Sequence, residues 1–234
     1  MRHLRNTIGI YVWLSILVAA LLTSCVAEAQ IVAFGASNVS GWNVKSSEAF
    51  PEQIQSMLHA KGYPVRVLNA GVYGNTTKEM LARLDTDVPK NTTIVILDTS
   101  GGNFNDRFQG LPEAETTKNM DEIVRRFKAR SITIIPENSS QIPADLKQAD
   151  GRHLTAEGHK KLAEEILPKV IEVLGPPPNT PMAHMMAACQ SDAERLCANY
   201  LGNAEKRHAC MHEHRSELSR DCKKAIVESK AASQ

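Results

Sequence analysis

Four short apolar runs alternate with segments in which apolar residues recur at helical spacing, and no other feature limits the fold as strongly. The runs are residues 31–34, 65–68, 93–97 and 132–135. The helical segments lie at residues 50–58, 80–84, 120–127 and 162–174. Short apolar runs are typical of buried strands, and strands that alternate with helices predict a parallel sheet covered on both faces. In such sheets, sites form in the loops at the carboxyl ends of the strands.

A different kind of sequence follows the last helical segment. Gly175 and the three prolines after it cannot continue a helix, so residues 176–182 are predicted to form a linker. Composition therefore divides the chain into an α/β domain at residues 30–175 and a cysteine-rich helical module at residues 183–228.

The module contains four cysteines, whereas the α/β region has none. They are Cys189, Cys197, Cys210 and Cys222. An even number of cysteines in a short exported segment predicts two disulfides, and the segment resembles the small cysteine-rich repeats of exported proteins. Cys197 and Cys210 lie at similar distances from a predicted turn near Gly202, which favours a bond between two antiparallel helices. Cys189–Cys222 would then be the second bond, although the spacing does not fix the connectivity.

The first thirty residues have the features of an export signal. Basic residues precede an uncharged apolar run at residues 8–22, which is short for a bilayer span. Residues 27–29 fit a signal-peptide cleavage site after Ala29, and residues 22–25 fit a lipobox that would make Cys25 a lipidated N-terminus. We expect a periplasmic or secreted chain without a transmembrane span after processing, and both processing routes remain open.

Charge and histidine spacing set expectations about ligands. The net charge is +1 and no basic stretch is dense, so the sequence indicates no nucleic-acid partner. His208, His212 and His214 lie in the module, but their spacing matches no standard zinc pattern. We therefore expect no metal and no cofactor, and a small molecule as the ligand of the α/β domain. The sequence does not indicate a partner for the module.

Polar and glycine-rich segments follow the predicted strands where a site would form. Ser37 follows the first strand, and Asp150 stands three residues before His153 in the loop that leads to the last helix. That spacing lets an aspartate reach the imidazole of the histidine, which can in turn activate a serine. Glycine amides and an asparagine side chain after the second and third strands could donate hydrogen bonds to an oxyanion. Each segment alone also fits an ordinary turn or helix cap.

Together these segments resemble, in the same order, the four sequence blocks of the SGNH (GDSL-like) hydrolase family. The blocks here are residues 31–38, 69–77, 101–106 and 150–159, and the likeness extends over about residues 31–174. It looks closest to the branch of small exported arylesterases, thioesterases and lysophospholipases. The resemblance implies a flavodoxin-like three-layer α/β/α fold and a serine esterase that acts without a metal. The shortened segment between the fourth strand and Asp150 favours short-chain acyl or aryl esters as its substrates.

The same resemblance implies a role for each residue. Ser37 would attack the ester carbonyl, His153 would move the proton, and Asp150 would orient His153. The oxyanion would be held by the backbone amides of Ser37 and Gly74 and by an asparagine side chain.

The sequence departs from the family pattern in three places. The aspartate that precedes the serine in the family is Ala36 here. The third block is stretched, so strand spacing favours Asn103 as the oxyanion donor while the family's Asn-Asp pair favours Asn105, and Asn103 is preferred. Residues 136–150 are too few for the helix and fifth strand that normally lie there, which predicts a shortened sheet and an open, shallow site.

Two other functions remain compatible with these residues. Ala36 and the shortened loop also fit a non-catalytic exported binding protein whose hydrolase domain has decayed. The intact Ser37, Asp150 and His153 would equally serve a carbohydrate O-deacetylase.

Overall fold

Four parallel strands form one sheet in the residues that this computed structural model describes, 30–201 and 203–232. They are β1 (Gln30–Gly35), β2 (Arg66–Gly71), β3 (Thr92–Asp98) and β4 (Thr133–Glu137). Their order, β2-β1-β3-β4, is that of a flavodoxin-like sheet that stops before a fifth strand. The predicted export signal and Cys25 lie outside the described residues.

β4 extends two residues beyond the apolar run at residues 132–135 and includes Pro136. Leu97 of β3 pairs with Pro136, and Asp98 pairs with Glu137. The proline is tolerated because β4 lies at the edge of the sheet, where one side of the strand needs no ladder hydrogen bonds. As a result, the strand carries Glu137 to the carboxyl edge of the sheet beside Asp98.

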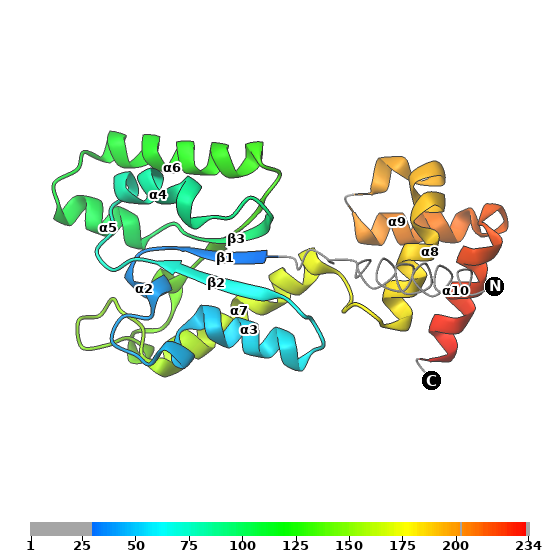
Figure 1. Ribbon diagram of the computed structural model, residues 1–234, viewed down its shortest axis with the longest axis horizontal. Helices are drawn as coiled ribbons and strands as arrows, with labels where there is room; N and C mark the ends of the chain where they lie inside the picture. Colours follow the sequence, from blue (N-terminus) through cyan, green and yellow to red (C-terminus); the bar gives the residue numbers. More distant parts are fainter. Residues whose placement is uncertain (1–29, 202, 233–234) are drawn as a thin grey trace, which may run out of the picture.

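Helices cover both faces of the sheet and give the three predicted layers (Figure 1). α4 (Thr77–Asp87) and α6 (Glu113–Ala129) cover one face, and α3 (Phe50–Ala60) and α7 (Ala156–Leu174) cover the other. Val32 and Phe34 of the central β1 enter the core under α4 and α6, while Ile31 and Ala33 enter the core under α3 and α7. Each large apolar side chain contributes roughly 1.5–3 kcal/mol when fully buried, so the two cores hold the strand ends in place.

Short helices and turns occupy the carboxyl edge. α2 (Ser37–Ser40) follows β1 directly, a 3-10 turn at Ser46–Glu48 leads to α3, and α5 (Gly101–Phe108) forms where the sequence suggested a turn. Between β4 and α7 the described chain makes 3-10 turns at Ser139–Gln141 and Ala144–Leu146, and neither a strand nor an α-helix. The predicted shortening of the sheet is therefore confirmed.

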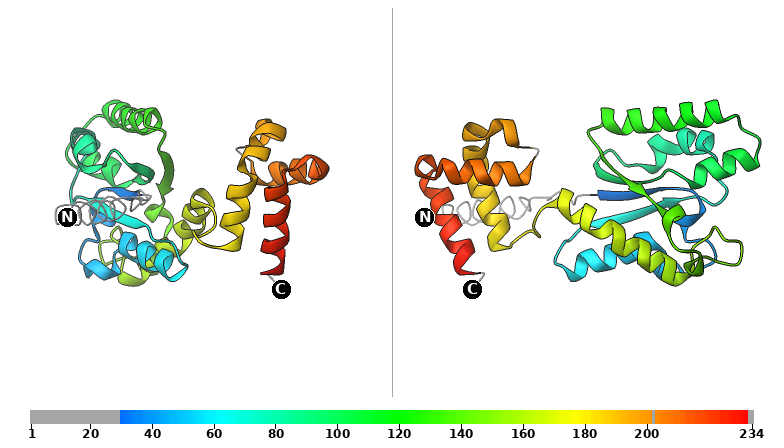
Figure 2. Two further views of the ribbon diagram at one scale, coloured as in Figure 1. Left: turned by 45° about the vertical axis from the view of Figure 1, so that its right-hand side comes forward. Right: turned by 180° about the vertical axis from the view of Figure 1, so that it is seen from behind.

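Three helices form the C-terminal module. They are α8 (Pro181–Leu196), α9 (Ala204–Glu213) and α10 (Arg220–Ala231), with 3-10 turns at Ala198–Tyr200 and Arg215–Glu217. The disulfides are Cys189–Cys222 and Cys197–Cys210, as the spacing favoured. The module lies beyond the amino ends of the strands, at the opposite end of the sheet from α2 and α5 (Figures 1 and 2). No helix in the described ranges is long and apolar enough to cross a membrane.

Candidate active site

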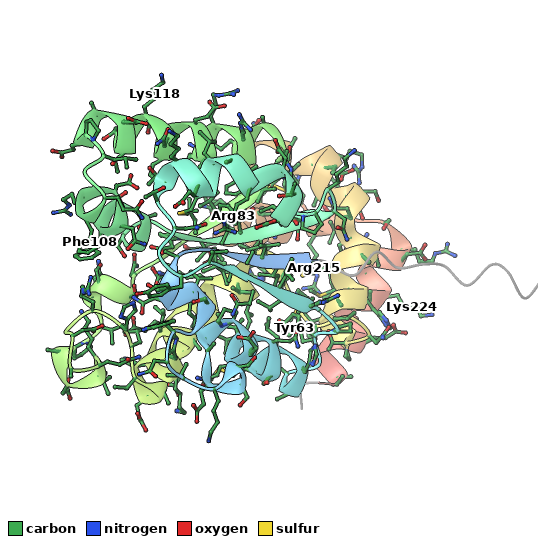
Figure 3. The ribbon with its side chains drawn as sticks, turned by 60° about the vertical axis from the view of Figure 1, so that its left-hand side comes forward. Tyr63, Arg83, Phe108, Lys118, Arg215 and Lys224 are labelled. Atoms are coloured by element: carbon green, nitrogen blue, oxygen red, sulfur yellow. A yellow bond between two sulfur atoms is a disulfide. The ribbon has the colours of Figure 1, made fainter. Side chains whose placement is uncertain are left out.

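A pocket of about 660 Å³ opens at the carboxyl edge of the sheet. The residues that line it follow β1, β2 and β3 or precede α7, and include Ser37, Gly74, Asn105 and His153. This is the edge at which parallel α/β sheets form their sites. Phe108 also lines the pocket, and Figure 3 shows it on the opposite side of the molecule from Arg215 and Lys224 of the C-terminal module.

The structure brings Ser37, His153 and Asp150 into one hydrogen-bonded chain. His153 Nε2 lies 2.9 Å from Ser37 Oγ, and His153 Nδ1 lies 2.5 Å from Asp150 Oδ2. Ser37 is the first residue of α2 and leaves β1 at a sharp turn, so it reaches the pocket directly from the end of the strand. A carboxylate on one ring nitrogen fixes the tautomer in which the other nitrogen can accept the serine proton.

The turn that carries Asp150 aims its carboxylate at the imidazole. Asp150 Oδ1 accepts hydrogen bonds from the backbone N–H groups of Arg152 and His153, which leaves Oδ2 for the ring. Burial raises the pKa of Asp150, but the hydrogen bonds from the His153 ring and the two N–H groups outweigh it and lower this pKa to about 2. Asp150 is therefore ionised at neutral pH and can stabilise a protonated His153.

Asn38 connects the turn of Ser37 to the loop of His153. Its Oδ1 accepts the N–H of Leu154 at 3.1 Å, and its Nδ2 donates to Ser139 Oγ at 3.2 Å. These bonds join segments that are more than a hundred residues apart in the chain, so they hold the serine and the histidine at a fixed separation. From the sequence alone Asn38 had no assigned role beyond its position next to Ser37.

The two candidate asparagines point in different directions from α5. Asn105 lines the pocket; its Nδ2 donates to the carbonyl of Asn75 at 2.8 Å, and the amide has a second hydrogen for a substrate. Asn103 does not line the pocket, and its Nδ2 donates to the Thr99 carbonyl one turn back. The geometry favours Asn105 over Asn103, the residue preferred from strand spacing, and the oxyanion role stays a prediction. Residues two apart on a helix point roughly 200° apart, so only one of the two faces the pocket.

Asp106 anchors α5 in the orientation that presents its neighbour Asn105. The Asp106 carboxylate is fully buried and accepts hydrogen bonds from the N–H of Thr77 at 2.7 Å, from Thr77 Oγ1 at 2.5 Å and from Thr116 Oγ1 at 2.6 Å. Thr77 begins α4 and Thr116 lies in α6, so one carboxylate fastens three helices together.

Ser37 and Gly74 line the same pocket as Asn105. Ser37 begins α2, where the first backbone N–H groups of a helix lack intrahelical acceptors. Gly74 has a φ of 77°, in the left-handed region that favours glycine, and this turns the chain after β2. Ser37, Gly74 and Asn105 thus share one pocket, and their role as donors to a substrate oxygen stays a prediction.

The aspartate that precedes the serine in the family is replaced by Ala36 here. A different buried carboxylate, that of Asp98, supports the turn that holds Ser37. Asp98 Oδ2 accepts the N–H of Ala36 at 3.0 Å, and Asp98 Oδ1 accepts the N–H of Ser100 at 2.9 Å. Gly35 makes room for this contact, since a Cβ at Gly35 would lie 2.2 Å from Asp98 Cβ. The sequence signal for Asp98 was a charged residue at the end of an otherwise apolar strand.

Glu137 lies beside Asp98 at the end of β4 and is fully buried. Its Oε1 accepts the N–H of Ser139 at 3.1 Å, and its Oε2 has no hydrogen-bond partner among the described residues. Burial, followed by the negative charge of Asp98, raises the pKa of Glu137 to about 8. Glu137 is therefore mainly protonated at neutral pH.

Arg83 of α4 reaches across the ends of β1 and β2. Its guanidinium donates to the carbonyls of Gly35 and Ala70, both at 2.8 Å, and to Asn75 Oδ1 at 2.6 Å. It also lies 4.5 Å from the centroid of the Phe34 ring. Because the carbonyl of Asn75 receives the Asn105 amide, Arg83 helps to position both the serine turn and the side of the pocket that carries Asn105. The helical spacing of α4 gave no signal for this inward-facing arginine.

Two aromatic rings stand beside the catalytic histidine candidate. Trp42 and Tyr73 stack with their ring centroids 3.9 Å apart, and lie 6.3 and 6.2 Å from the His153 ring. Both remain partly exposed, at 43% and 55%, and Tyr73 lines the pocket.

The second histidine of the last block has a packing role. His159 Nδ1 accepts the N–H of Phe50 at 3.4 Å and joins α7 to α3. Burial and then the proximity of His153 lower the pKa of His159 to about 4, so it is neutral at pH 7. In the described part of the chain, no group of three or more His, Cys, Asp or Glu side chains is arranged to hold a metal.

Comparison with known proteins identifies the family. Residues 33–192 match the GDSL-like Lipase/Acylhydrolase family. The chain belongs to this family. Two curated relatives match at 25% identity: Esterase TesA of Pseudomonas aeruginosa over 119 residues, and an arylesterase of Vibrio mimicus over 109 residues. These alignments cover 51% and 47% of this chain and 58% and 54% of the relatives, so the chain spans little more than half of their length.

Solved structures show the same fold. The esterase EstA from Pseudoalteromonas sp., inhibited by monoethylphosphonate, matches with a TM-score of 0.55 at 16% identity over 63% of this chain and 99% of that chain. A crystal structure of TesA matches with a TM-score of 0.52 at 20% identity, over 62% of this chain and 99% of that chain. The family resemblance and the α/β fold expected from the four sequence blocks are thus confirmed.

Proposed function

We propose that this chain is an exported serine esterase that hydrolyses carboxylic esters with short acyl chains or aryl groups. One observation carries the proposal: a continuous hydrogen-bonded chain runs from Ser37 Oγ through His153 to Asp150, at 2.9 and 2.5 Å, and Ser37 opens on a pocket. Family membership supports the reaction class, and so do the names of two relatives, an esterase and an arylesterase.

In the first half-reaction, Ser37 Oγ attacks the carbonyl carbon of the ester while its proton passes to His153 Nε2. Asp150 stabilises the imidazolium that forms. The oxygen that becomes negative accepts hydrogen bonds from the N–H groups of Ser37 and Gly74 and from Asn105 Nδ2. When the tetrahedral intermediate collapses, the alcohol leaves with the proton from Nε2, and the acyl group remains on Ser37.

In the second half-reaction, His153 Nε2 takes a proton from a water molecule that attacks the acyl-serine. The oxyanion binds to the same three donors. Collapse of the intermediate returns the proton to Ser37 Oγ and releases the carboxylic acid. This sequence requires no metal or cofactor, because every proton is moved by His153.

The preference for short acyl groups rests on the short segment after β4. Ser139, Ser140 and Lys147 of this segment line the pocket and offer little apolar surface to an acyl chain. Each CH₂ that is buried contributes roughly 0.8 kcal/mol, so a chain that stays in water gains little from added length. We expect kcat/KM over p-nitrophenyl esters to be highest between acetate and hexanoate. A steady rise towards palmitate, measured below the aggregation limit of each ester, would contradict this preference.

Export and domain division are part of the proposal. Two disulfides support an oxidising compartment, periplasmic or extracellular, because cytosolic thiols are kept reduced. Residues 30–175 would form the hydrolase domain, residues 176–182 the linker, and residues 183–228 a separate helical module. A lipid anchor at Cys25 remains a prediction from the sequence.

Labelling with a fluorophosphonate probe tests the proposal directly. The processed protein should take up one label, at Ser37, and Ser37→Ala should remove it. Ser56→Ala, an exposed serine on α3, is the control and should retain the label. A protein that takes up no label and cleaves no ester would instead be the exported binding protein, and selective release of acetate from acetylated sugars would indicate an O-deacetylase.

A further inference from the structure

The pocket beside Ser37 is lined by cationic side chains. Three basic side chains line it, and no Asp or Glu is among the described residues that do so. The three are Arg107, Lys147 and Arg152. The chain as a whole has a formal net charge of only +1, so this concentration belongs to the pocket and not to a generally basic protein.

The three cations come from separate parts of the chain. Arg107 lies in the last turn of α5, Lys147 follows the 3-10 turn at Ala144–Leu146, and Arg152 lies in the turn between Asp150 and His153. Side chains from three unrelated segments thus converge on one opening. A solvated stripe on a single helix would not give this arrangement.

None of the three forms a salt bridge with another described residue. The Arg152 guanidinium lies 4.2 Å from the centroid of the Phe104 ring, and Lys147 Nζ donates to the carbonyl of Ser140 at 3.1 Å. Elsewhere on the surface, comparable side chains do pair with carboxylates, as Arg126 does with Glu122 and Lys161 with Glu165. Arg152 and Lys147 are therefore held at the pocket by contacts with uncharged groups, and none of the three cations is paired with a carboxylate among the described residues.

We propose that the substrate carries an anionic group, a carboxylate or a phosphate, in addition to the ester that is cleaved. The proposal rests on the proposed esterase function and specifies its substrate class. A cleft lined by one sign of charge concentrates ligands of the opposite sign. Guanidinium groups bind carboxylates and phosphates through paired hydrogen bonds, and Phe104 holds Arg152 from one face while leaving its N–H edge for a ligand.

The aromatic side chains that share the pocket suit the uncharged part of such a molecule. Phe104 and Phe108 line the pocket with their ring centroids 6.4 Å apart, and Tyr73 lines it beside His153. A compact ester with a short alkyl or aryl body and a charged end would contact both kinds of surface. The negative group could belong to the acyl part or to the alcohol part, so the test needs one arm for each.

The test compares matched esters that differ in charge. In the acyl arm, mono-p-nitrophenyl glutarate is compared with its neutral methyl ester, and the release of p-nitrophenolate is followed. In the alcohol arm, 4-acetoxybenzoate is compared with 4-acetoxybenzamide. Each kcat/KM is divided by the rate constant for hydroxide-catalysed hydrolysis of the same ester. In at least one arm the anionic ester should be favoured by about tenfold or more at low salt, as electrostatic steering permits.

Salt and substitutions separate this effect from intrinsic reactivity. The preference should shrink as ionic strength rises from about 0.02 to 0.5 M, because exposed charges are then screened. Arg107→Gln, Lys147→Gln and Arg152→Gln should each lower the anionic-to-neutral ratio, by roughly threefold, since each removes one charge from the pocket. Lys118→Gln is the control, because Lys118 projects from α6 away from the pocket (Figure 3) and its loss changes the net charge equally.

The outcomes distinguish the two proposals. If Ser37 is labelled by a fluorophosphonate but neutral esters are cleaved as well as anionic ones in both arms, the anionic substrate is wrong and the esterase stands. If nothing is labelled or cleaved, the esterase itself is wrong. If Ser37 is labelled but none of the four esters is cleaved, the anionic preference is tested by whether a ligand protects Ser37 against the fluorophosphonate. Glutarate should then protect Ser37 at low salt while glutaramide does not, and equal protection would overturn the proposal.

Discussion

The α/β domain and the C-terminal module are held together by different means. The α/β domain buries 18 and 10 residues in its two apolar clusters and has no cysteine. The module has a cluster of three buried residues, Cys189, Leu218 and Cys222, of which two are joined as a disulfide. Small units that bury little apolar surface depend on disulfides, so the module needs an oxidising environment for its order and the α/β domain does not.

The position of the chemistry follows the same division. The proposed catalytic residues all lie in the α/β domain: Ser37, His153 and Asn105 line the pocket and Asp150 bonds to His153. The pocket is at the end of the sheet where α2 and α5 lie, away from the module (Figure 1). Within that domain, the residues that would contact the ester are held in place by other residues that would not contact it. Asp98 and Glu137, next to the serine turn, belong to this supporting set. The loss of activity on substitution should therefore be largest at the reacting residues, smaller at the residues that support them, and smallest in the module.

The largest effect is expected at the nucleophile. Ser37→Ala should lower kcat by roughly 10⁴-fold or more, as when an acyl-transfer nucleophile is lost. The measurement is p-nitrophenyl acetate hydrolysis with the labelled fraction of enzyme as the active-site count. Ser56→Ala should retain the full rate, and a Ser37→Ala protein of unchanged rate would remove Ser37 from the mechanism.

The next effect concerns the oxyanion and distinguishes the two asparagines. Asn105→Ala should lower kcat by roughly 10²–10³-fold, the usual cost of losing one oxyanion donor. Asn103→Ala is its matched control on the same helix and should cost much less, because its amide bonds to Thr99 outside the pocket. A greater loss at Asn103 than at Asn105 would mean that α5 is oriented differently when substrate is bound.

A smaller effect is expected from the support beneath the serine. Asp98→Asn replaces an acceptor of the Ala36 and Ser100 N–H groups by a weaker, uncharged one. Hydrogen bonds to charged groups contribute roughly 1.5–3 kcal/mol, and if about half of this acts on the serine turn, kcat falls roughly tenfold. KM should change little, since Asp98 does not line the pocket. Asp85→Asn, a mostly exposed aspartate on α4, is the control; a rise in KM without a fall in kcat would argue against a positioning role.

Glu137 should make stability depend on pH. Its pKa is about 8 in the folded chain against an ordinary value of 4.5, so the folded state binds more protons between these pH values. The free energy of unfolding should therefore fall as pH rises from about 5 to 8, by at most roughly 1.4 kcal/mol per pH unit. Glu137→Gln should flatten this fall, and Glu172→Gln on α7 should not.

Urea unfolding at pH 5, 6.5 and 8 measures this dependence. Trp42 reports on the α/β domain, because the other tryptophan, Trp13, lies within the predicted export signal. Parallel curves for the unmodified chain and Glu137→Gln would show that Glu137 is not held neutral in the fold.

Most of the fold and the proposed reacting residues follow from local sequence patterns. The apolar runs predicted the strands because their burial on both faces leaves little polar character, and Ser37, Asp150 and His153 stand in short motifs. The supports could not be predicted, because each acts on a distant segment: Ala36 and Asp98 are 62 residues apart, and Arg83 and Gly35 are 48 apart. The pattern of residues within a short stretch of sequence carries no information about contacts between residues that are so far apart.

The choice between Asn103 and Asn105 depends on a different physical effect. Gly101 and Gly102 disfavour a helix, so the sequence favoured a loop after β3. In the structure α5 begins at Gly101, and the buried Asp106 bonds to Thr77 and Thr116 on two neighbouring helices. These tertiary contacts outweigh the local propensity, and they turn Asn105 rather than Asn103 towards the pocket.

The smallest effect is expected from the module. A chain that ends at Gly175 keeps every proposed catalytic residue and the hydrogen bond from the Tyr63 hydroxyl to the Gly175 carbonyl. Its kcat/KM for p-nitrophenyl butyrate should stay within roughly twofold of the full chain, because the module lies at the other end of the sheet.

The double variant Cys197→Ser/Cys210→Ser tests the same point in the full chain. Removal of a disulfide from so small a unit costs roughly 2–5 kcal/mol, so the module should become sensitive to proteases while ester hydrolysis continues. A loss of more than about tenfold in the truncated chain, with Trp42 fluorescence unchanged, would show that the module takes part in catalysis and that the division between the two regions is wrong.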